Sequence, residues 1–123
     1  PASMSDAIEA FQSVASDDQP RLYIIGGMEE LGPKAADYHH QLGKSLRLRA
    51  DDYLFTIGSH ADSVRDGLLA NENRPDQVEV VTDLAPVAAK IAHFSGAVFV
   101  KGSRRYQLER ILEAEVPVTS GAH

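Results

Sequence analysis

The first candidates for chemistry are Lys101, Ser103 and Arg104, which follow the apolar run at residues 98–100. A short run of β-branched and aromatic residues predicts a buried strand, and Ser103 is placed to cap the helix that follows it. The free N–H groups and the dipole of such a helix start favour an anion. The segment therefore predicts a site for a carboxylate or a phosphate, or else a capping serine beside solvated basic residues. The residue types alone do not separate these two interpretations.

A glycine-rich turn provides the second group of candidates. Residues 22–25 form an apolar run without alternation, which predicts a strand buried on both faces, and Gly26 and Gly27 end it. Adjacent glycines allow a sharp turn and a close approach to the backbone. The turn continues through Met28, Glu30, Leu31 and Gly32. Glu30 could accept an ammonium group, although we favour capping of the helix near Pro33 or bracing of the loop.

Several common kinds of site are missing from the sequence. Gly26, Gly27 and Gly32 do not form a G-x-G-x-x-G dinucleotide motif, and the order of residues 101–103 is wrong for a phosphate loop. The chain has no Cys, which excludes disulfides and thiolate chemistry and fits a reducing cytoplasm. His39 shares an apolar helix face with Leu42 and Leu46, which predicts a buried, hydrogen-bonded ring. The other histidines considered for metal binding are too dispersed to suggest a site: His60, His93 and His123.

Helices and strands that alternate along the chain must position these residues. We expect helices over residues 3–15, 35–49, from Ser59 onward, and 84–93, and strands over 22–25, 53–57, 78–81 and 96–100. Ser59, with Asp62 three residues later, and Asp83 are the expected N-caps of the third and fourth helices. A last helix should bury Leu108, Ile111 and Leu112, and residues 116–123 should add an edge strand or fray. Inward-facing positions include Met4, Ala7, Ile8, Phe11, Val14 and Ala15, then Ala61, Val64, Leu68 and Leu69, and finally Val87, Ile91 and Ala92.

This alternation predicts an α/β fold with an open, mostly parallel sheet and helices on both faces. In such a sheet every strand-to-helix loop opens at the same edge. Residues 26–32, 58–60, 82–83 and 102–104 should therefore line one rim, which is where open α/β sheets bind their ligands.

Three segments together resemble the C-terminal domain of the Mur ligases. They are Gly26-Gly27-Met28-Glu29-Glu30-Leu31-Gly32 followed by His39-His40-Gln41-Leu42-Gly43, Val98-Phe99-Val100-Lys101-Gly102-Ser103-Arg104 followed by Glu109, and Pro1-Ala2-Ser3-Met4. The family patterns are G-D-M-x-E-L-G with H-x-x-x-G, V-K-G-S-R, and the end of Y-N-A-N-P-x-S-M. Gly27 stands where the family usually has Asp, so no role of that carboxylate carries over. The E-L-G and K-G-S-R pair is most similar to the members that add D-alanyl-D-alanine to UDP-N-acetylmuramoyl-tripeptide.

The resemblance implies a Rossmann-like domain of an ATP- and Mg²⁺-dependent ligase of peptidoglycan biosynthesis in the cytoplasm. In this family a carboxylate is phosphorylated and an amine then attacks the acyl phosphate. The central domain holds ATP and Mg²⁺, while the C-terminal domain brings the incoming amino acid or dipeptide and closes the site. The resemblance therefore implies that these residues contact substrate or nucleotide: Lys101, Ser103, Arg104, Met28, Glu30, Leu31 and Gly32. No residue is assigned as catalytic or metal-binding, and the domain alone is expected to be inactive.

The partners implied are UDP-N-acetylmuramoyl-peptide, D-alanyl-D-alanine and the central ATPase domain of the same polypeptide. Two alternatives stay open. One is the C-terminal domain of another Mur ligase or of a folylpolyglutamate-type ligase. The other is a free-standing α/β module that binds a small molecule, because a fold does not dictate a function.

Length and charge limit the remaining possibilities. With 123 residues, of which 43% are hydrophobic, we expect residues 1–123 to form a single domain, and the resemblance makes it part of a larger three-domain chain. The formal net charge of -6 argues against a general affinity for nucleic acid or anionic membranes. The longest apolar runs are of strand length, far below the roughly 20 residues that span a bilayer.

Overall fold

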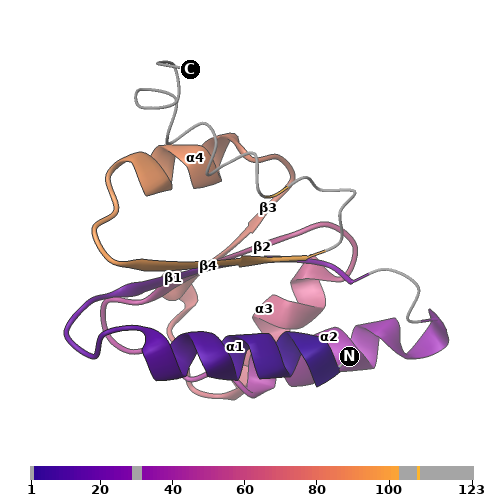
Figure 1. Cartoon of the computed structure of the whole chain (residues 1–123). Coiled ribbons are helices and arrows are strands. Elements are labelled where there is room, and N and C mark those ends of the chain that lie inside the picture. Colours follow the sequence, from indigo (N-terminus) through magenta and orange to yellow (C-terminus); the bar gives the residue numbers. More distant parts are fainter. Residues whose placement is uncertain (1, 29–31, 103–107, 109–123) are drawn as a thin grey trace, which may run out of the picture.

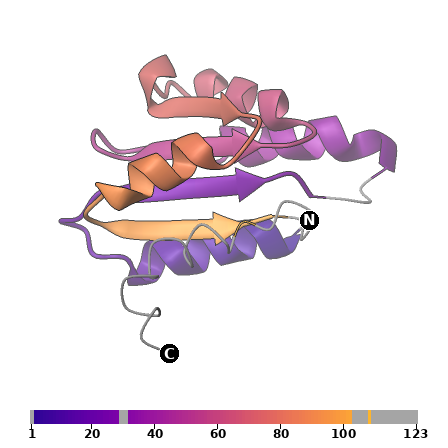
Figure 2. The same cartoon turned by 90° about the horizontal axis from the view of Figure 1, so that it is seen from above.

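The computed structural model describes residues 2–28, 32–102 and 108, and this part of the chain forms a four-stranded parallel sheet (Figure 1). Its strands are β1 (Arg21–Gly26), β2 (Tyr53–Ile57), β3 (Val78–Val81) and β4 (Ala97–Lys101), in the spatial order β3-β2-β1-β4. Every residue of β1 is buried, as the unbroken apolar run predicted. Seen from above, the four arrows point the same way (Figure 2). The predicted open, parallel α/β sheet is confirmed.

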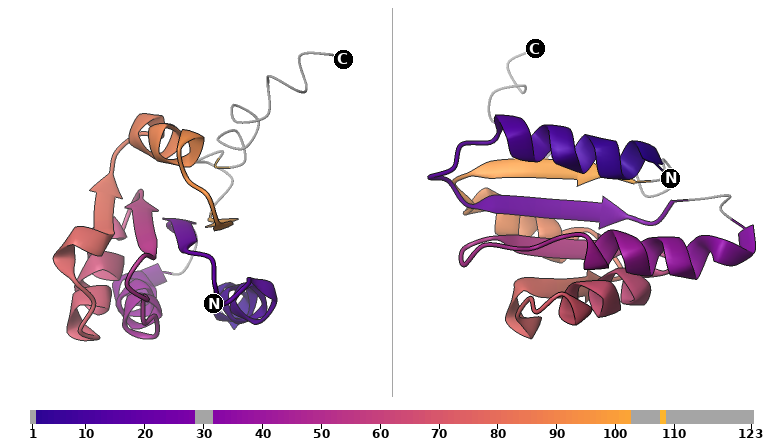
Figure 3. Two further views of the ribbon diagram at one scale, coloured as in Figure 1. Left: turned by 90° about the vertical axis from the view of Figure 1, so that its left-hand side faces the viewer. Right: turned by 90° about the horizontal axis from the view of Figure 1, so that it is seen from below.

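Helices cover both faces of this sheet. α1 (Ala2–Val14), α2 (Ala35–Lys44) and α3 (Ala61–Ala70) lie on one face, and α4 (Ala85–Ala92) crosses the other (Figures 1 and 3). The short 3-10 helices η1 (Gly32–Lys34) and η2 (Pro75–Gln77) precede α2 and β3. Each face has its own apolar cluster, and the predicted core residue Leu108 belongs to the one on the α4 side. Ile111, Leu112 and the predicted tail strand lie outside the described residues.

α2 ends at Lys44, so the helix predicted over residues 35–49 was too long. Leu46 and Leu48 are nevertheless buried, because side-chain amides hold their backbone in a non-helical path. The Nδ2 groups of Asn71 and Asn73 each donate to the carbonyl oxygen of Leu46 at 2.9 Å. Asn73 Oδ1 accepts from the backbone N–H of Leu48 at 2.7 Å. These bonds replace those that a longer helix would have made.

α3 also begins differently from the prediction. Its N-cap is His60 rather than Ser59, with φ of 68° and no capping bond from its side chain. The turn from β2 uses positive φ at both Gly58 and His60, which delays the first helical residue to Ala61. The N-cap of α4 is Leu84 rather than the predicted Asp83, although Asp83 Oδ1 accepts a hydrogen bond from the backbone N–H of Ala85 at 2.9 Å.

Three residues predicted to face the core are exposed instead. Val14 and Leu69 retain 82% and 38% of their accessible surface, and Ala92 is also exposed. All three lie in the last turn of their helices, where the apolar stripe has rotated away from the sheet. In α3 the buried position beside Leu68 belongs to Gly67.

Candidate ligand-binding rim

The carboxyl ends of the four parallel strands meet at one edge, as predicted (Figure 2). The chain passes from β1 to β2 to β3 in one direction and then crosses back to place β4 on the other side of β1. This reversal makes the ends of β1 and β4 the topological switch point, the usual ligand position in open α/β sheets. We call residues 26–28 the β1 exit, and they face the end of β4 across this point.

β1 and β4 approach each other very closely at the switch point. Ile25 pairs with Lys101, and a Cβ atom on Gly102 would lie 2.6 Å from the Cα of Gly26. Such a contact leaves no room for any side chain at residue 102. The glycine of the predicted Lys101-Gly102-Ser103 segment therefore allows the end of β4 to lie directly against the backbone of β1.

Of the two basic residues predicted at the rim, Lys101 lies within the described part of the chain. It is the last residue of β4 and is half-buried, and no carboxylate among the described residues forms an ion pair with it. An ammonium group that is partly removed from water, with no carboxylate partner in the described part of the chain, favours an anionic ligand. Ser103 and Arg104, predicted to act with it, lie outside the described residues.

The β1 exit contains the second set of predicted residues. Met28 is half-buried and packs against the core on the α1–α3 side, while Gly27 donates its N–H to the carbonyl oxygen of Ile57 at 3.0 Å. Gly32 has φ of 68° and begins η1 in an exposed position. Glu30 and Leu31 lie outside the described residues. Of the seven predicted contacts, the structure thus places Met28, Gly32 and Lys101, and it brings the exits of β1 and β4 together.

His39 is buried and hydrogen-bonded as predicted, but its surroundings were not foreseen. Its ring stacks on that of His60, with centroids 5.1 Å apart and an interplanar angle of 19°. Burial lowers the pKa of His39 from its ordinary value of 6.5, the bond to Ala35 opposes this, and charge on His60 lowers it further. The sequence contained no signal for the pair, because the contact arises from the packing of α2 beside the start of α3.

The loops after β2 and β3 line a groove of about 530 Å³ next to the switch point. Its walls include Gly58 and His60 from the first loop and Thr82 from the second, as predicted for the rim. Asp62 and Ser63 from the first turn of α3 also line it. The groove extends the rim from the β1 exit toward the β3 edge of the sheet.

Two further features bear on the kind of site. Residues 2–28, 32–102 and 108 contain no group of three or more His, Cys, Asp or Glu side chains able to hold a metal ion. In the same part of the chain, no helix combines the length and the apolar character needed to cross a membrane.

Comparisons with known proteins agree on one family. The model of the Mur ligase family, glutamate ligase domain, matches residues 1–104. A curated UDP-N-acetylmuramoyl-tripeptide--D-alanyl-D-alanine ligase from Rickettsia prowazekii (strain Madrid E) is 26% identical over 113 residues, which are 92% of this chain and 24% of the relative. Crystal structure II of MurF from Acinetobacter baumannii shares the fold with a TM-score of 0.71 at 20% identity, over 94% of this chain and 25% of that chain. The chain therefore spans about a quarter of the length of these relatives.

Proposed function

The chain belongs to the Mur ligase family through its glutamate ligase domain, and from that premise we propose that it is the closing, substrate-binding domain of a D-alanyl-D-alanine-adding ligase. The observation that carries the proposal is the switch point, where Lys101 lies unpaired among the described residues beside a glycine-lined backbone contact. The Rickettsia relative, named for D-alanyl-D-alanine addition, supports this choice of acceptor over other amines.

We assign Lys101 to an anionic group of the reactants, either the carboxylate of the dipeptide or a phosphate of the nucleotide. An ammonium in this position would orient the bound group and offset its negative charge. Ser103 and Arg104, which follow in the sequence, are assigned to the same anion, and Met28, Glu30, Leu31 and Gly32 to the wall of the same cleft.

The described residues fit one part of the ligation reaction. They include neither a metal-binding cluster nor a phosphate loop, so we assign ATP and Mg²⁺ to the central domain of the longer polypeptide. When bound there, these groups supply the activated acyl phosphate. This domain would hold the incoming amine near that carbon and exclude water, so that the C–N bond forms and phosphate leaves with the electrons of the C–O bond. We expect the isolated domain to catalyse no ligation.

Lys101→Ala in the full-length ligase tests the assignment. We expect kcat/KM to fall by about 10- to 10²-fold, because a hydrogen bond to a charged group contributes about 1.5–3 kcal/mol. Separate titrations of dipeptide and ATP show which KM rises, and therefore which anion Lys101 contacts. Lys44→Ala, an exposed change at the end of α2, is the matched control. An unchanged kcat/KM in Lys101→Ala, or an equal loss in the control, would refute the assignment.

The larger polypeptide is tested independently. Translation of the source DNA upstream of the Pro1 codon should show a G-x-x-G-K-[ST]-type loop within the same reading frame, with Y-N-A-N directly before Pro1. A stop codon or a start signal immediately upstream would leave a free-standing module, and ligand screening at Lys101 would then replace ligation assays.

A further inference from the structure

His39 is a fully buried histidine whose two ring nitrogens both have partners. Its Nδ1 lies 2.7 Å from the carbonyl oxygen of Ala35, and because a carbonyl can only accept, Nδ1 carries the proton. Its Nε2 lies 3.0 Å from the backbone nitrogen of Met28, which donates its N–H, so Nε2 carries none. This arrangement defines a neutral ring in a single tautomer.

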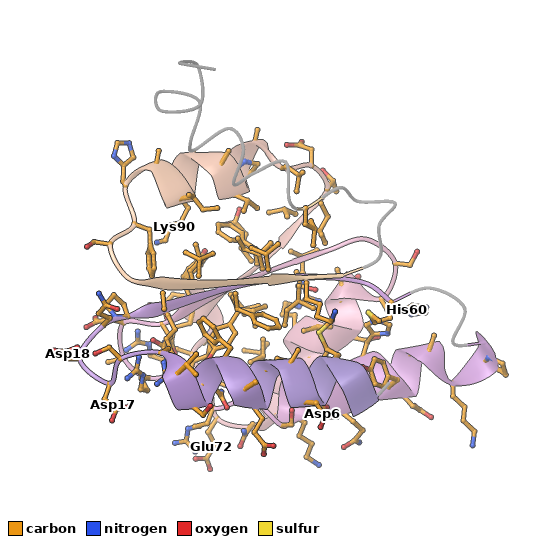
Figure 4. All side chains as sticks on the ribbon, viewed as in Figure 1. Asp6, Asp17, Asp18, His60, Glu72 and Lys90 are labelled. Carbon is orange, nitrogen blue, oxygen red and sulfur yellow. The ribbon has the colours of Figure 1, made fainter. Side chains whose placement is uncertain are left out.

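The bond to Met28 joins two elements that the chain separates. Met28 belongs to the β1 exit, while His39 lies one turn into α2 beyond η1. The ring is therefore a clamp between the rim backbone and the helix layer below the sheet. On its other side the stacked His60 is the N-cap of α3, and Figure 4 shows this residue at the rim end of the sheet.

The groups around the ring decide how it responds to a proton. The ring of Tyr38 in α2 meets the His39 ring edge-on, with centroids 5.3 Å apart, and the ring of His60 stacks on it. The β1 exit contributes the backbone amide of Met28. Asp62, in the first turn of α3, is already paired with Arg65 at 3.6 Å. Glu29 and Glu30 follow Met28 in the sequence and lie outside the described residues. Among the described residues, none of these neighbours offers a carboxylate to the protonated ring.

We propose that His39 is a positioning residue of the rim: its neutral ring holds the β1 exit through the Met28 amide, and protonation of Nε2 releases that exit. An imidazolium has no lone pair left to accept the Met28 N–H, so the two donors would face each other. The β1 exit forms one side of the switch point, so release would disturb the rim. The relevance to ligation rests on the proposed function, whereas the proton-linked release does not.

The direction of the pH effect follows from linkage. Burial lowers the pKa of His39 below its ordinary value of 6.5, so the open or unfolded chain binds the proton more tightly than the clamped one. The clamp therefore contributes its full stability above pH 6.5, and this contribution falls as the pH drops from there through the lowered pKa.

Nuclear magnetic resonance of the intact 123-residue chain tests the proposal without any variant. We expect ¹⁵N shifts of a neutral ring protonated at Nδ1 near pH 7, and a Met28 amide shift that titrates together with the ring. Below pH 6.5 the hydrogen-exchange protection of Met28 should fall by up to about tenfold per pH unit, the slope for one linked proton. The amide of Ile25, inside β1, should keep its protection over the same range.

Substitutions of histidines distinguish release of the Met28 amide by His39 from a general loss of stability at low pH. His39→Gln should remove the pH dependence of the Met28 amide, while His93→Gln, at the exposed C-cap of α4, should leave it unchanged. His60→Asn, which tolerates positive φ, should raise the pKa of His39, because it removes the neighbouring charge and part of the cover. The proposal would be overturned if the Met28 amide shift did not change as the His39 ring titrates, or if the ring were protonated at Nε2 near neutral pH. If His39→Gln fails to fold, the titration of the unaltered chain still decides.

Discussion

Asp52 shows how one side chain can fix the amino-terminal edge of the sheet. It is 3% exposed, and its Oδ1 accepts from the backbone N–H of Arg21 at 2.8 Å. Its Oδ2 accepts from the backbone N–H of Arg49 at 2.9 Å and from the Arg49 Nε at 3.2 Å. The carboxylate thus joins the start of β1 to the turn before β2. Both strands then enter the sheet in the register that brings their other ends to the rim.

Asp52→Ala should lower the free energy of unfolding by about 2–4 kcal/mol, because the backbone amides of Arg21 and Arg49 lose their acceptor. The Arg49 guanidinium keeps the carbonyl oxygens of Asp17 and Gln19 as acceptors. Asp52→Asn keeps one acceptor oxygen and should lose less. Urea denaturation measures both. Asp51→Ala, at the exposed neighbouring position, should stay within about 0.5 kcal/mol of the unaltered chain. Equal losses at residues 51 and 52 would contradict this account.

At the scale of elements, α2 and α3 pack through glycines rather than through larger side chains. A Cβ on Gly43 would lie 2.1 Å from the carbonyl oxygen of Val64, and one on Gly67 would lie 2.0 Å from that of His40. The helices therefore touch backbone to backbone at this crossing (Figure 3). This contact keeps the start of α3 beside α2, where His60 reaches the ring of His39.

Gly43→Ala and Gly67→Ala should each destabilise the domain by about 2–4 kcal/mol, because the helices must separate to admit a methyl group. In an exposed helix the same change would stabilise by about 0.5–1 kcal/mol, so the sign of the effect is diagnostic. Thermal unfolding of each variant, with the exposed change Gln41→Ala in α2 as control, measures it. The double variant should cost less than the sum of the two, since one separation accommodates both methyl groups. A raised melting temperature in either single variant would disprove the close contact.

At the scale of the whole molecule, the buried polar contacts of Asp52 lie at the amino-terminal edge of the sheet, and the proposed ligand contacts lie at the opposite edge. β4 is anchored at both ends by glycines: a Cβ on Gly96 would lie 2.3 Å from the carbonyl oxygen of Pro20, and one on Gly102 would lie 2.6 Å from Gly26 Cα. The first contact lies at the amino-terminal edge and the second at the switch point. These two positions form a matched pair.

Gly96→Ala and Gly102→Ala should both destabilise the domain, by about 1–3 kcal/mol each. Gly102→Ala alone should shift the amide resonances of Gly27 and Met28, because the added methyl group pushes the end of β4 away from the β1 exit. Heteronuclear spectra of the two variants make this comparison. Equal shifts at the β1 exit in both variants would show that the two ends of the sheet are not independent.

The pattern of residues predicted the strands, their parallel direction and hence the rim, since unbroken apolar runs such as residues 22–25 and 53–57 favour strands covered on both faces. The spatial order β3-β2-β1-β4 was not predicted. Alternation with helices then placed Met28 and Lys101 at the same edge. Burial of His39 followed from its position on the apolar face with Leu42. These features depend on the periodicity of apolar residues, which can be read from neighbouring positions in the sequence.

Tertiary packing determined the ends of helices and the contacts between side chains, which the periodicity of apolar residues does not predict. The amides of Asn71 and Asn73 ended α2 at Lys44, and the positive φ of His60 moved the start of α3 beyond Ser59. The stack of His60 on His39 exists only because α2 and α3 meet at two glycines. Each of these outcomes depends on contacts between residues far apart in sequence, whose energies arise only after the sheet has brought them together.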